Sequence, residues 1–359
     1  MRKRRFILTW INRLLLLGTL VSGIGSLLPA NIFAGASLLS LIFPTLIVPH
    51  IVLLIVTLRI SKKRILPNLI GIALTLIPAL AQFPFTKPKD QPQDCLRIAT
   101  YNVRAFYQGL DAPEKMNTWA ERENIDVLCL QEVRRPSHKP LEKSFSHVAF
   151  APKISRYSVG IFSKYPIIHT EPLTFSYVEQ GKRYPTRSAG LADIVLPWDT
   201  VRFINVHLNS TGVQDGDMEV APSTEELLER GKQIARKLAG SDRTRGLQSK
   251  SILEWIEESP HPVVLCGDFN SVPGGNLYAR LLLHLEDPYI FKGSGKMGSF
   301  EPLKRRYLPI RIDWTLHSEG IESYDQHIDH INLSDHYPLV TIIGPPIEEK
   351  ATSEEEQPR

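Results

Sequence analysis

Residues 262–270 read Pro-Val-Val-Leu-Cys-Gly-Asp-Phe-Asn. The apolar run Val263–Cys266 is typical of a strand that is covered on both faces of its sheet. Gly267, Asp268 and Asn270 follow at once, and these residue types end strands and turn the chain. A carboxylate and an amide therefore stand at the end of a buried strand, where folds often assemble functional sites.

The same arrangement, polar side chains at the end of an apolar run, occurs at five other places. They are Tyr101-Asn102-Val103-Arg104, Leu130-Gln131-Glu132-Val133, Asn205-Val206-His207-Leu208-Asn209, Arg311-Ile312-Asp313-Trp314 and Leu333-Ser334-Asp335-His336. Each segment alone is typical of a turn, a solvated strand end or a helix cap. Their joint occurrence in one chain favours a shared site.

Short apolar runs predict eight strands in residues 95–347. They are Leu96–Tyr101, Asp126–Gln131, Val159–Ser163, Ala189–Leu196, Val201–Leu208, Pro262–Cys266, Ile312–Leu316 and Pro338–Ile343. Amphipathic periodicity predicts helices over Glu114–Glu123, Ser223–Leu238 and Gly246–Glu258, the second with a capping box at Ser223 and Glu226. This mixture predicts a two-sheet core with helices outside.

The ordered set of motifs resembles the endonuclease/exonuclease/phosphatase superfamily, which includes relatives of deoxyribonuclease I and neutral sphingomyelinase. The resemblance covers about residues 95–345 and also rests on Gly160-Ile161-Phe162-Ser163. It implies an α/β (α+β) fold, a four-layer αββα sandwich of two packed mixed sheets. It also implies metal-dependent hydrolysis of a phosphate ester.

The resemblance implies a role for eight residues. Glu132 is the expected first metal ligand, with Asn102 and Asp335 beside the ion, which is expected to be Mg²⁺, or else Mn²⁺ or Ca²⁺. Asp268 matches the carboxylate that activates the attacking water, and Asn270 and His207 match donors to the phosphate. His336 matches a proton donor, and Asp313 is expected to pair with it within hydrogen-bonding distance.

Other polar residues are expected to lie outside the site. These are His138, His169, His261, His284, His317, His327 and His330. Lys304-Arg305-Arg306, Arg243 and Arg245 are interpreted first as solvated charges and second as contacts for an anionic substrate.

Composition is uneven along the 359 residues. The chain holds 42 basic and 38 acidic residues, but residues 1–86 hold nine Lys or Arg and no acid. The rest therefore carries 33 basic and 38 acidic side chains, a net charge of −5. An acidic catalytic region weakens the case for a high-affinity DNA-binding surface. Three cysteines without a Cys-x-x-Cys pair predict buried free thiols at Cys129 and Cys266.

The N-terminal segment is apolar enough to cross a membrane. No charged residue occurs from Leu14 to Leu58, and a bilayer core needs about 20 apolar residues per helix. We predict three spans, at about residues 12–30, 36–58 and 65–83. Basic clusters at Arg2–Arg5 and Arg59–Arg64 then face the cytoplasm, so the catalytic domain lies outside it. Two alternatives are a cleaved signal peptide and a third stretch that does not cross.

The predicted organisation is a transmembrane segment at 1–86, a linker at 87–94, a catalytic domain at 95–347 and a disordered acidic tail at 348–359. The predicted function is a phosphoesterase in a bacterial inner membrane, with its catalytic domain in the periplasm or outside the cell. The expected partners are the bilayer and a phosphate-ester substrate (lipid, nucleotide or nucleic acid), with no obligate protein partner. A nuclease and an inactive tethered binding module are the alternatives.

Overall fold

The structure, a computed structural model, describes residues 2–87, 92, 94–134, 137–151, 158–179, 182–213, 217, 223–301 and 310–346. The predicted tail, the cluster Lys304-Arg305-Arg306 and most of the predicted linker lie outside the described residues.

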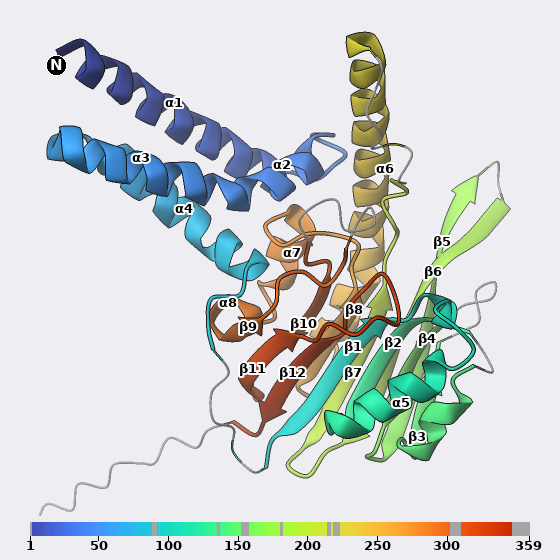
Figure 1. Cartoon of the computed structure of the whole chain (residues 1–359). Helices are drawn as coiled ribbons and strands as arrows, with labels where there is room; N and C mark the ends of the chain where they lie inside the picture. Colours follow the sequence, from blue (N-terminus) through green and yellow to red (C-terminus); the bar gives the residue numbers. More distant parts are fainter. Residues whose placement is uncertain are drawn as a thin grey trace, which may run out of the picture.

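Two mixed sheets stack against each other (Figure 1). The seven-stranded sheet has the order β3-β4-β2-β1-β12-β11-β9, and the five-stranded sheet has the order β10-β8-β7-β6-β5. The strands are β1 (Leu96–Asn102), β2 (Val127–Val133), β3 (His147–Phe150), β4 (Ser158–Ser163), β5 (Ile167–Glu179), β6 (Lys182–Val195), β7 (Thr200–His207), β8 (Val263–Asp268), β9 (Gly293–Gly295), β10 (Asp313–His317), β11 (Glu322–Ile328) and β12 (Leu339–Gly344).

Helices cover the outer faces of both sheets. They are α5 (Ala112–Arg122), α6 (Thr224–Glu257), α7 (Asn276–Leu281) and α8 (Tyr289–Lys292). Met116 and Trp119 of α5 pack against the seven-stranded sheet, whereas Ile252 and Ile256 of α6 pack against the five-stranded sheet. The predicted four-layer αββα sandwich is therefore confirmed.

The layer between the sheets is apolar. Ile98 and Cys129 of the seven-stranded sheet meet Phe203, Val264 and Cys266 of the five-stranded sheet. Both cysteines are buried and free, as the sequence predicted. The consecutive apolar residues of β2 and β8 follow from burial on both faces, between a helix and the opposite sheet.

All eight predicted strands are present, but four others were not predicted: β3, β5, β9 and β11. The two helices predicted over Ser223–Leu238 and Gly246–Glu258 are one continuous helix, α6. The prediction of a break was wrong because Gly240 and Gly246 both continue the helix. The capping box is present, since Ser223 Oγ accepts a hydrogen bond from the Glu226 backbone.

The N-terminal segment forms α1 (Arg2–Leu27), α2 (Ala36–Ile42), α3 (Ile47–Ile60) and α4 (Leu66–Gln82). Among the described residues, two helical stretches are long and apolar enough to cross a membrane, Lys3–Leu27 and Ala36–Ile60. The third predicted span, α4, has 17 residues, or about 25 Å at 1.5 Å per residue. It is shorter than a hydrocarbon core of about 30 Å. Two of the three predicted spans are therefore long enough to cross a membrane, and the third is a shorter apolar helix.

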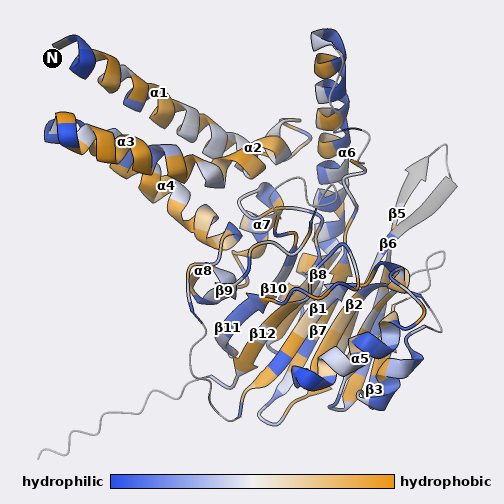
Figure 2. Ribbon diagram, viewed as in Figure 1, coloured by the Kyte–Doolittle hydropathy of each residue, from blue (hydrophilic) through white to orange (hydrophobic). Residues whose placement is uncertain are grey.

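Polar side chains join these helices to one another. Asn12 Nδ2 of α1 donates to Thr57 Oγ1 of α3 at 3.0 Å, and Thr19 Oγ1 lies 2.9 Å from His50 Nε2. Arg64 Nη1 also donates to the Arg5 carbonyl at 2.8 Å. This last contact brings the two basic clusters to the same end of the bundle, where Figure 2 shows hydrophilic residues.

The other end of the bundle contacts the sandwich. Asn276 Nδ2 of α7 donates to the Leu27 carbonyl at 2.8 Å. Arg311, which is buried beside β10, donates to the Ala81 carbonyl of α4 at 2.7 Å and forms an ion pair with Asp287. The N-terminal helices therefore pack against the elements that follow β8 and precede β10.

Candidate active site

Strand register aligns three polar residues at one edge of the five-stranded sheet. β7 and β8 run parallel with His207 opposite Asp268, and β10 runs antiparallel to β8 with Asp313 opposite Asp268. Each of the three residues is buried. Residues that are 61 and 45 positions apart along the chain therefore become neighbours through pairing alone.

The backbone before Asp268 requires glycine. Gly267 has φ of 140°, and a Cβ atom added there would lie 2.0 Å from the Val206 carbonyl oxygen. This close approach of β7 and β8 is possible only without a side chain. It places the Asp268 carboxylate directly beside His207, with 3.6 Å between Oδ2 and Nε2.

Two hydrogen bonds hold the Asp268 carboxylate. Asn102 Nδ2 donates to Oδ2 at 3.0 Å, and the Asn270 backbone N–H donates to Oδ1 at 2.9 Å. Burial raises the pKa of Asp268 to about 6, although the His336 charge opposes the rise. A carboxylate with a pKa of about 6 is suited to accept a proton near neutral pH.

The seven-stranded sheet contributes Asn102 and Glu132. β1 and β2 are parallel neighbours, so their carboxyl ends lie at the same edge. A bulge between Leu130 and Val133 interrupts the pairing of β2 with β4, and Glu132 has φ of 55°. Bulges next to active sites redirect a side chain. The carboxylate of Glu132 lies 3.7 Å from His207 Nε2 and is partly exposed.

Asp313 and His336 form the contact that the sequence predicted. Asp313 Oδ2 accepts a hydrogen bond from His336 Nδ1 at 2.9 Å, and both residues are buried. Burial alone would lower the pKa of His336, but the carboxylates of Asp313 and Asp268 raise it to about 10. His336 Nε2 is 3.8 Å from Asp268 Oδ2, so the imidazolium faces the centre of the site.

His207, unlike His336, is held in the neutral form. Burial lowers its pKa well below the ordinary value, and the nearby cations Arg187 and His336 lower it further. The site therefore holds one neutral and one charged imidazole at neutral pH, with Asp268 between them.

The side chains of Asp335 and Asn270, also predicted site residues, bond to groups other than Asp268. Asp335 forms an ion pair with Arg104 at 2.9 Å, and both side chains are partly exposed. The Asn270 side-chain amide donates to the Leu208 carbonyl at 3.1 Å. Arg245, a candidate substrate contact, is instead buried and donates to the Asn209 carbonyl at 2.9 Å.

Sequence reasoning missed two residues that shape the site. Asn205 is fully buried between the sheets and donates to the carbonyls of Leu130 and Gly160 while it accepts from Gln131 Nε2. It ties β7 to β2 and β4 below the site. Arg187 lies in β6 and lowers the pKa of His207. Asn205 begins the motif Asn205-Val206-His207-Leu208-Asn209, whereas nothing in the local sequence distinguishes Arg187.

The donor set fits a hard divalent cation. Glu132 offers a partly exposed carboxylate that lies 3.7 Å from His207 Nε2, beyond hydrogen-bonding distance. The Asn102 amide oxygen accepts from the Arg104 N–H at 3.0 Å, which leaves it a second lone pair. Oxygen ligands of this kind suit Mg²⁺. Asp268, Asp313 and His336 bring ligand-type atoms within 4.8 Å of one another, but a charged His336 is a donor and not a metal ligand.

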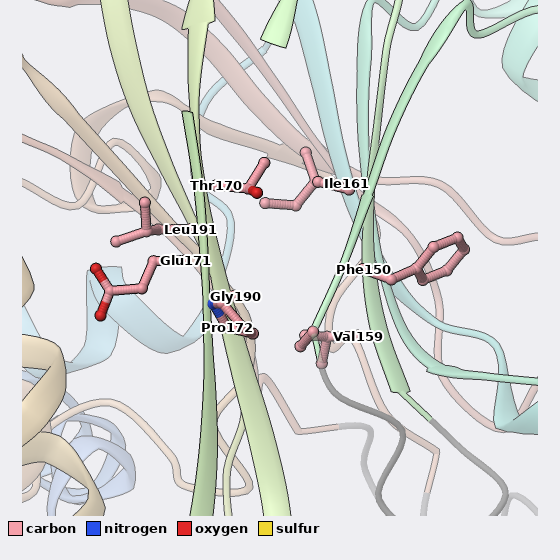
Figure 3. Close-up of a pocket in the computed structure, with 10 residues that line it drawn as sticks. Phe150, Val159, Ile161, Thr170, Glu171, Pro172, Gly190 and Leu191 are labelled. Carbon is pink, nitrogen blue, oxygen red and sulfur yellow. The ribbon is translucent and has the colours of Figure 1, made fainter. Parts of the chain in front are cut away.

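A hollow of about 450 Å³ lies between the loop after β1, the start of α5 and the segment after β2. The loop after β1 lines it through Phe106, Tyr107 and Leu110, and Arg134 after β2 adds a cation. A second cavity, of about 10 Å³, lies at the far side between β3, β4, β5 and β6 (Figure 3). It has room for about one water molecule. Of these two cavities, the larger has room for part of a substrate.

The sequence matches the model of the endonuclease/exonuclease/phosphatase family over residues 99–336. No curated protein is similar enough to count as a match.

Solved structures share the fold. A family protein from Bacteroides thetaiotaomicron has a TM-score of 0.51 at 15% identity, covering 71% of this chain and 96% of its own. A humanized D. rerio TDP2 has a TM-score of 0.53 at 15% identity, covering 70% and 100%. D. rerio TDP2 complexed with single-strand DNA product has a TM-score of 0.50 at 14% identity, again covering 70% and 100%.

The family whose model matches is one of hydrolases that act on phosphate esters. The chain belongs to the endonuclease/exonuclease/phosphatase family.

Proposed function

We propose that the protein is a membrane-anchored, divalent-metal-dependent phosphoesterase. The observation that carries this proposal is the placement of Asp268 between a neutral His207 and a charged His336, beside Asn102 and Glu132. This combination offers a base, two kinds of donor and oxygen ligands within one small volume.

Glu132 and Asn102 would hold the metal ion, with Asp335 near it. When bound, the ion would supply positive charge to the phosphate oxygens. The exposed fraction of the Glu132 side chain, 23%, leaves the carboxylate accessible from solvent. Mg²⁺ is the expected ion, and Mn²⁺ and Ca²⁺ are the alternatives.

Four side chains would activate the water and stabilise the phosphate. Asp268 orients the attacking water and accepts its proton, for which the raised pKa of about 6 is suitable. His207 and Asn270 donate hydrogen bonds to the phosphate as negative charge grows. His336, kept protonated by Asp313, donates a hydrogen bond or a proton to a phosphate oxygen.

The substrate is proposed to be a phosphodiester or phosphomonoester whose remaining part occupies the hollow beside Arg134 and Tyr107. A nuclease is the second candidate, supported by the shared fold with TDP2 in complex with a DNA product. The net charge of −5 on residues 87–359 favours a substrate other than a long nucleic acid.

The membrane topology is part of the proposal. Residues 1–86 would form the anchor and residues 95–347 the catalytic domain. Arg64 lies against Arg5, so both basic clusters would face the cytoplasm, and the sandwich contacts the opposite end of the bundle. The catalytic domain would then lie in the periplasm or outside the cell.

Purified full-length protein with Mg²⁺ should be assayed against DNA, RNA, a phospholipid, an inositol phosphate and a generic phosphodiester. We expect hydrolysis of at least one of them and a loss of about 10²–10⁴-fold in Asp268→Asn, the range for a positioned acid or base. A binding module without catalysis would show no difference between the two proteins. Hydrolysis by Asp268→Asn at the full rate would contradict the assigned site.

A further inference from the structure

The N-terminal half of α6, residues 224–238, carries an apolar face that is exposed at its first turns. Leu227 and Leu228 are each 61% exposed. Ile234 and Leu238 follow at helical spacing on the same side. Ile234 and Leu238 are half-buried, so the exposed part of this apolar stripe is the pair Leu227 and Leu228. Isolated exposed leucines are ordinary, but an exposed pair that continues an apolar helix face marks a candidate contact surface.

The stripe continues the face by which α6 packs on the sandwich. Ile252 and Ile256 lie on the same helical side, 14 and 18 residues after Leu238, and both belong to the core beneath the helix. Figure 1 shows the first half of α6 rising beyond the sheets, where that core ends. In Figure 2 hydrophobic and hydrophilic residues alternate along this projecting part. The amphipathic pattern of α6 therefore continues past the part of the helix that packs on the five-stranded sheet.

The N-terminal helices lie beside this part of the molecule. α2 contacts α6, and the turn before α2 exposes Ile32 (68%). Leu38 and Leu41 of α2 are also exposed, so apolar surface continues from the bundle toward the projecting half of α6. The turn at Ile32 lies at the end of α1 opposite the basic residues, where an anchored chain would leave the bilayer.

The polar side of the same half is charged. Arg230 pairs with Glu226, Lys232 with Glu229, and Lys237 with Asp217. Helices that lie in the plane of a bilayer surface combine these features: a charged face, an apolar face and long basic side chains. The aliphatic stems of Lys and Arg can reach along the apolar region while the charges stay in water.

From these observations we propose that residues 224–238 of α6 bind the surface of the bilayer that anchors the chain, with Leu227 and Leu228 in the acyl-chain boundary. The occupant of this apolar face is the lipid of the leaflet next to the α1–α2 turn. This inference rests on the proposed membrane anchoring.

The consequence concerns the active site. Gln248 of the same helix accepts a hydrogen bond from the Asn209 backbone, and Arg245 donates to the Asn209 carbonyl. These contacts lie two residues after His207, so α6 links the lipid-facing helix half to the edge that carries the site. Bilayer contact would therefore hold the site near the lipid headgroups.

Site-directed fluorescence in proteoliposomes tests the proposal. The full chain carries Cys95→Ser, because Cys95 is the cysteine that is not buried. A bimane probe is attached at Leu228→Cys, at Gln233→Cys on the opposite side of the same helix, or at Leu20→Cys on the exposed face of α1. Vesicles of phosphatidylcholine and phosphatidylglycerol then receive either brominated lipid or aqueous iodide as the quencher.

We expect brominated lipid to quench the probe at residue 228 several-fold more than the probe at residue 233, and iodide to show the reverse order.

The probe at residue 20 tests whether α1 itself lies in the bilayer. If lipid quenches residue 20 but iodide quenches residues 228 and 233 equally, the inference is wrong and the anchor stands. If lipid quenches none of the three, the anchoring proposal fails together with the inference. Protection of residue 228 from both quenchers, with a disulfide between two copies of Leu228→Cys, would assign the face to a second copy of the chain and overturn the lipid proposal.

Discussion

Glu132 and Asn270 adopt backbone conformations that residues with side chains seldom take. Their φ angles are 55° and 50°, in the left-handed region. Such a conformation costs on the order of 1–3 kcal/mol and persists where surrounding structure enforces it. Glu132 is the penultimate residue of β2 and Asn270 lies two residues after β8, and both strands end at the site. The backbone strain therefore coincides with the residues to which the family resemblance assigns metal and phosphate contacts.

The Asp313–His336 pair predicts a distinctive pH dependence. A raised pKa keeps His336 charged below about 10, so an activity that needs the imidazolium should be lost only as the pH rises through about 10. Asp313→Asn removes one of the two carboxylates that raise this pKa, so the alkaline limb of kcat/KM should move to lower pH. His336→Ala should reduce kcat/KM by about 10²–10⁴-fold, and the double variant should be little worse.

Asp325→Asn is the matched control for this prediction, because Asp325 pairs with His327 at 2.6 Å away from the cluster. The alkaline limb should stay in place in that variant. An unchanged limb in Asp313→Asn, or fully additive effects in the double variant, would show that the pair does not act as a unit.

At the residue level, the sequence identified the polar groups that terminate apolar runs, because a carboxylate or amide after such a run is conspicuous. The sequence did not identify the structural role of Asn205, whose side chain joins β7 to β2 and β4 across the interior. That role depends on which strands face each other across the sandwich. Local sequence carries no signal for such a contact.

Among the elements, β11 was missed because several of its buried side chains are polar. β11 reads Glu-Ser-Tyr-Asp-Gln-His-Ile, and its Ser323, Asp325 and Gln326 are buried. Gln326 Nε2 donates to Thr341 Oγ1 at 2.9 Å and to the Thr315 carbonyl at 3.0 Å. Hydrogen bonds to neighbouring strands offset the burial of these groups. A pattern of apolar residues could not reveal this strand.

The close packing of β8 on β7 predicts that one methyl group added at Gly267 strongly destabilises the protein. Gly267→Ala would force φ of 140° on a residue with a Cβ and place that atom 2.0 Å from the Val206 carbonyl oxygen. Backbone strain and overpacking together predict a loss of about 2–6 kcal/mol in the free energy of unfolding. Activity should fall as well, since Asp268 is the next residue.

Gly240→Ala is the matched control, because it lies within α6 and a Cβ there meets no other atom within 4 Å. That change should leave stability unchanged or raise it by up to about 1 kcal/mol. Denaturant unfolding of both variants measures the difference. Equal stabilities would contradict the close packing of β7 on β8.

For the whole molecule, the four-layer sandwich was predictable because its eight recognised strands carry apolar runs of ordinary length. The membrane segment was harder to predict. The apolar run through α2 and α3 is long, but α4 has only 17 residues and contains Pro78. Composition alone therefore does not decide whether this helix crosses, and its contacts with the sandwich depend on the tertiary structure.

Topology is tested by reporter fusions to the full chain. With α4 crossing, a C-terminal alkaline phosphatase should be active and a C-terminal green fluorescent protein dark. Fusions directly after Arg64 should give the opposite pattern, because that residue lies beside Arg5 at the basic end. A fluorescent C-terminal fusion would place the catalytic domain in the cytoplasm and overturn the three-span topology.

The most direct test of the account is the Mg²⁺ dependence of phosphodiester hydrolysis by full-length wild type and by Glu132→Gln, measured together. The wild type should lose all turnover in excess chelator and regain it with Mg²⁺. Glu132→Gln should keep its fold by circular dichroism yet need at least about 10–100-fold more Mg²⁺, the range seen when even an indirect metal contact is lost, or show no turnover. Full wild-type turnover in excess chelator, or identical Mg²⁺ curves for the two proteins, would contradict a metal-dependent site at Glu132.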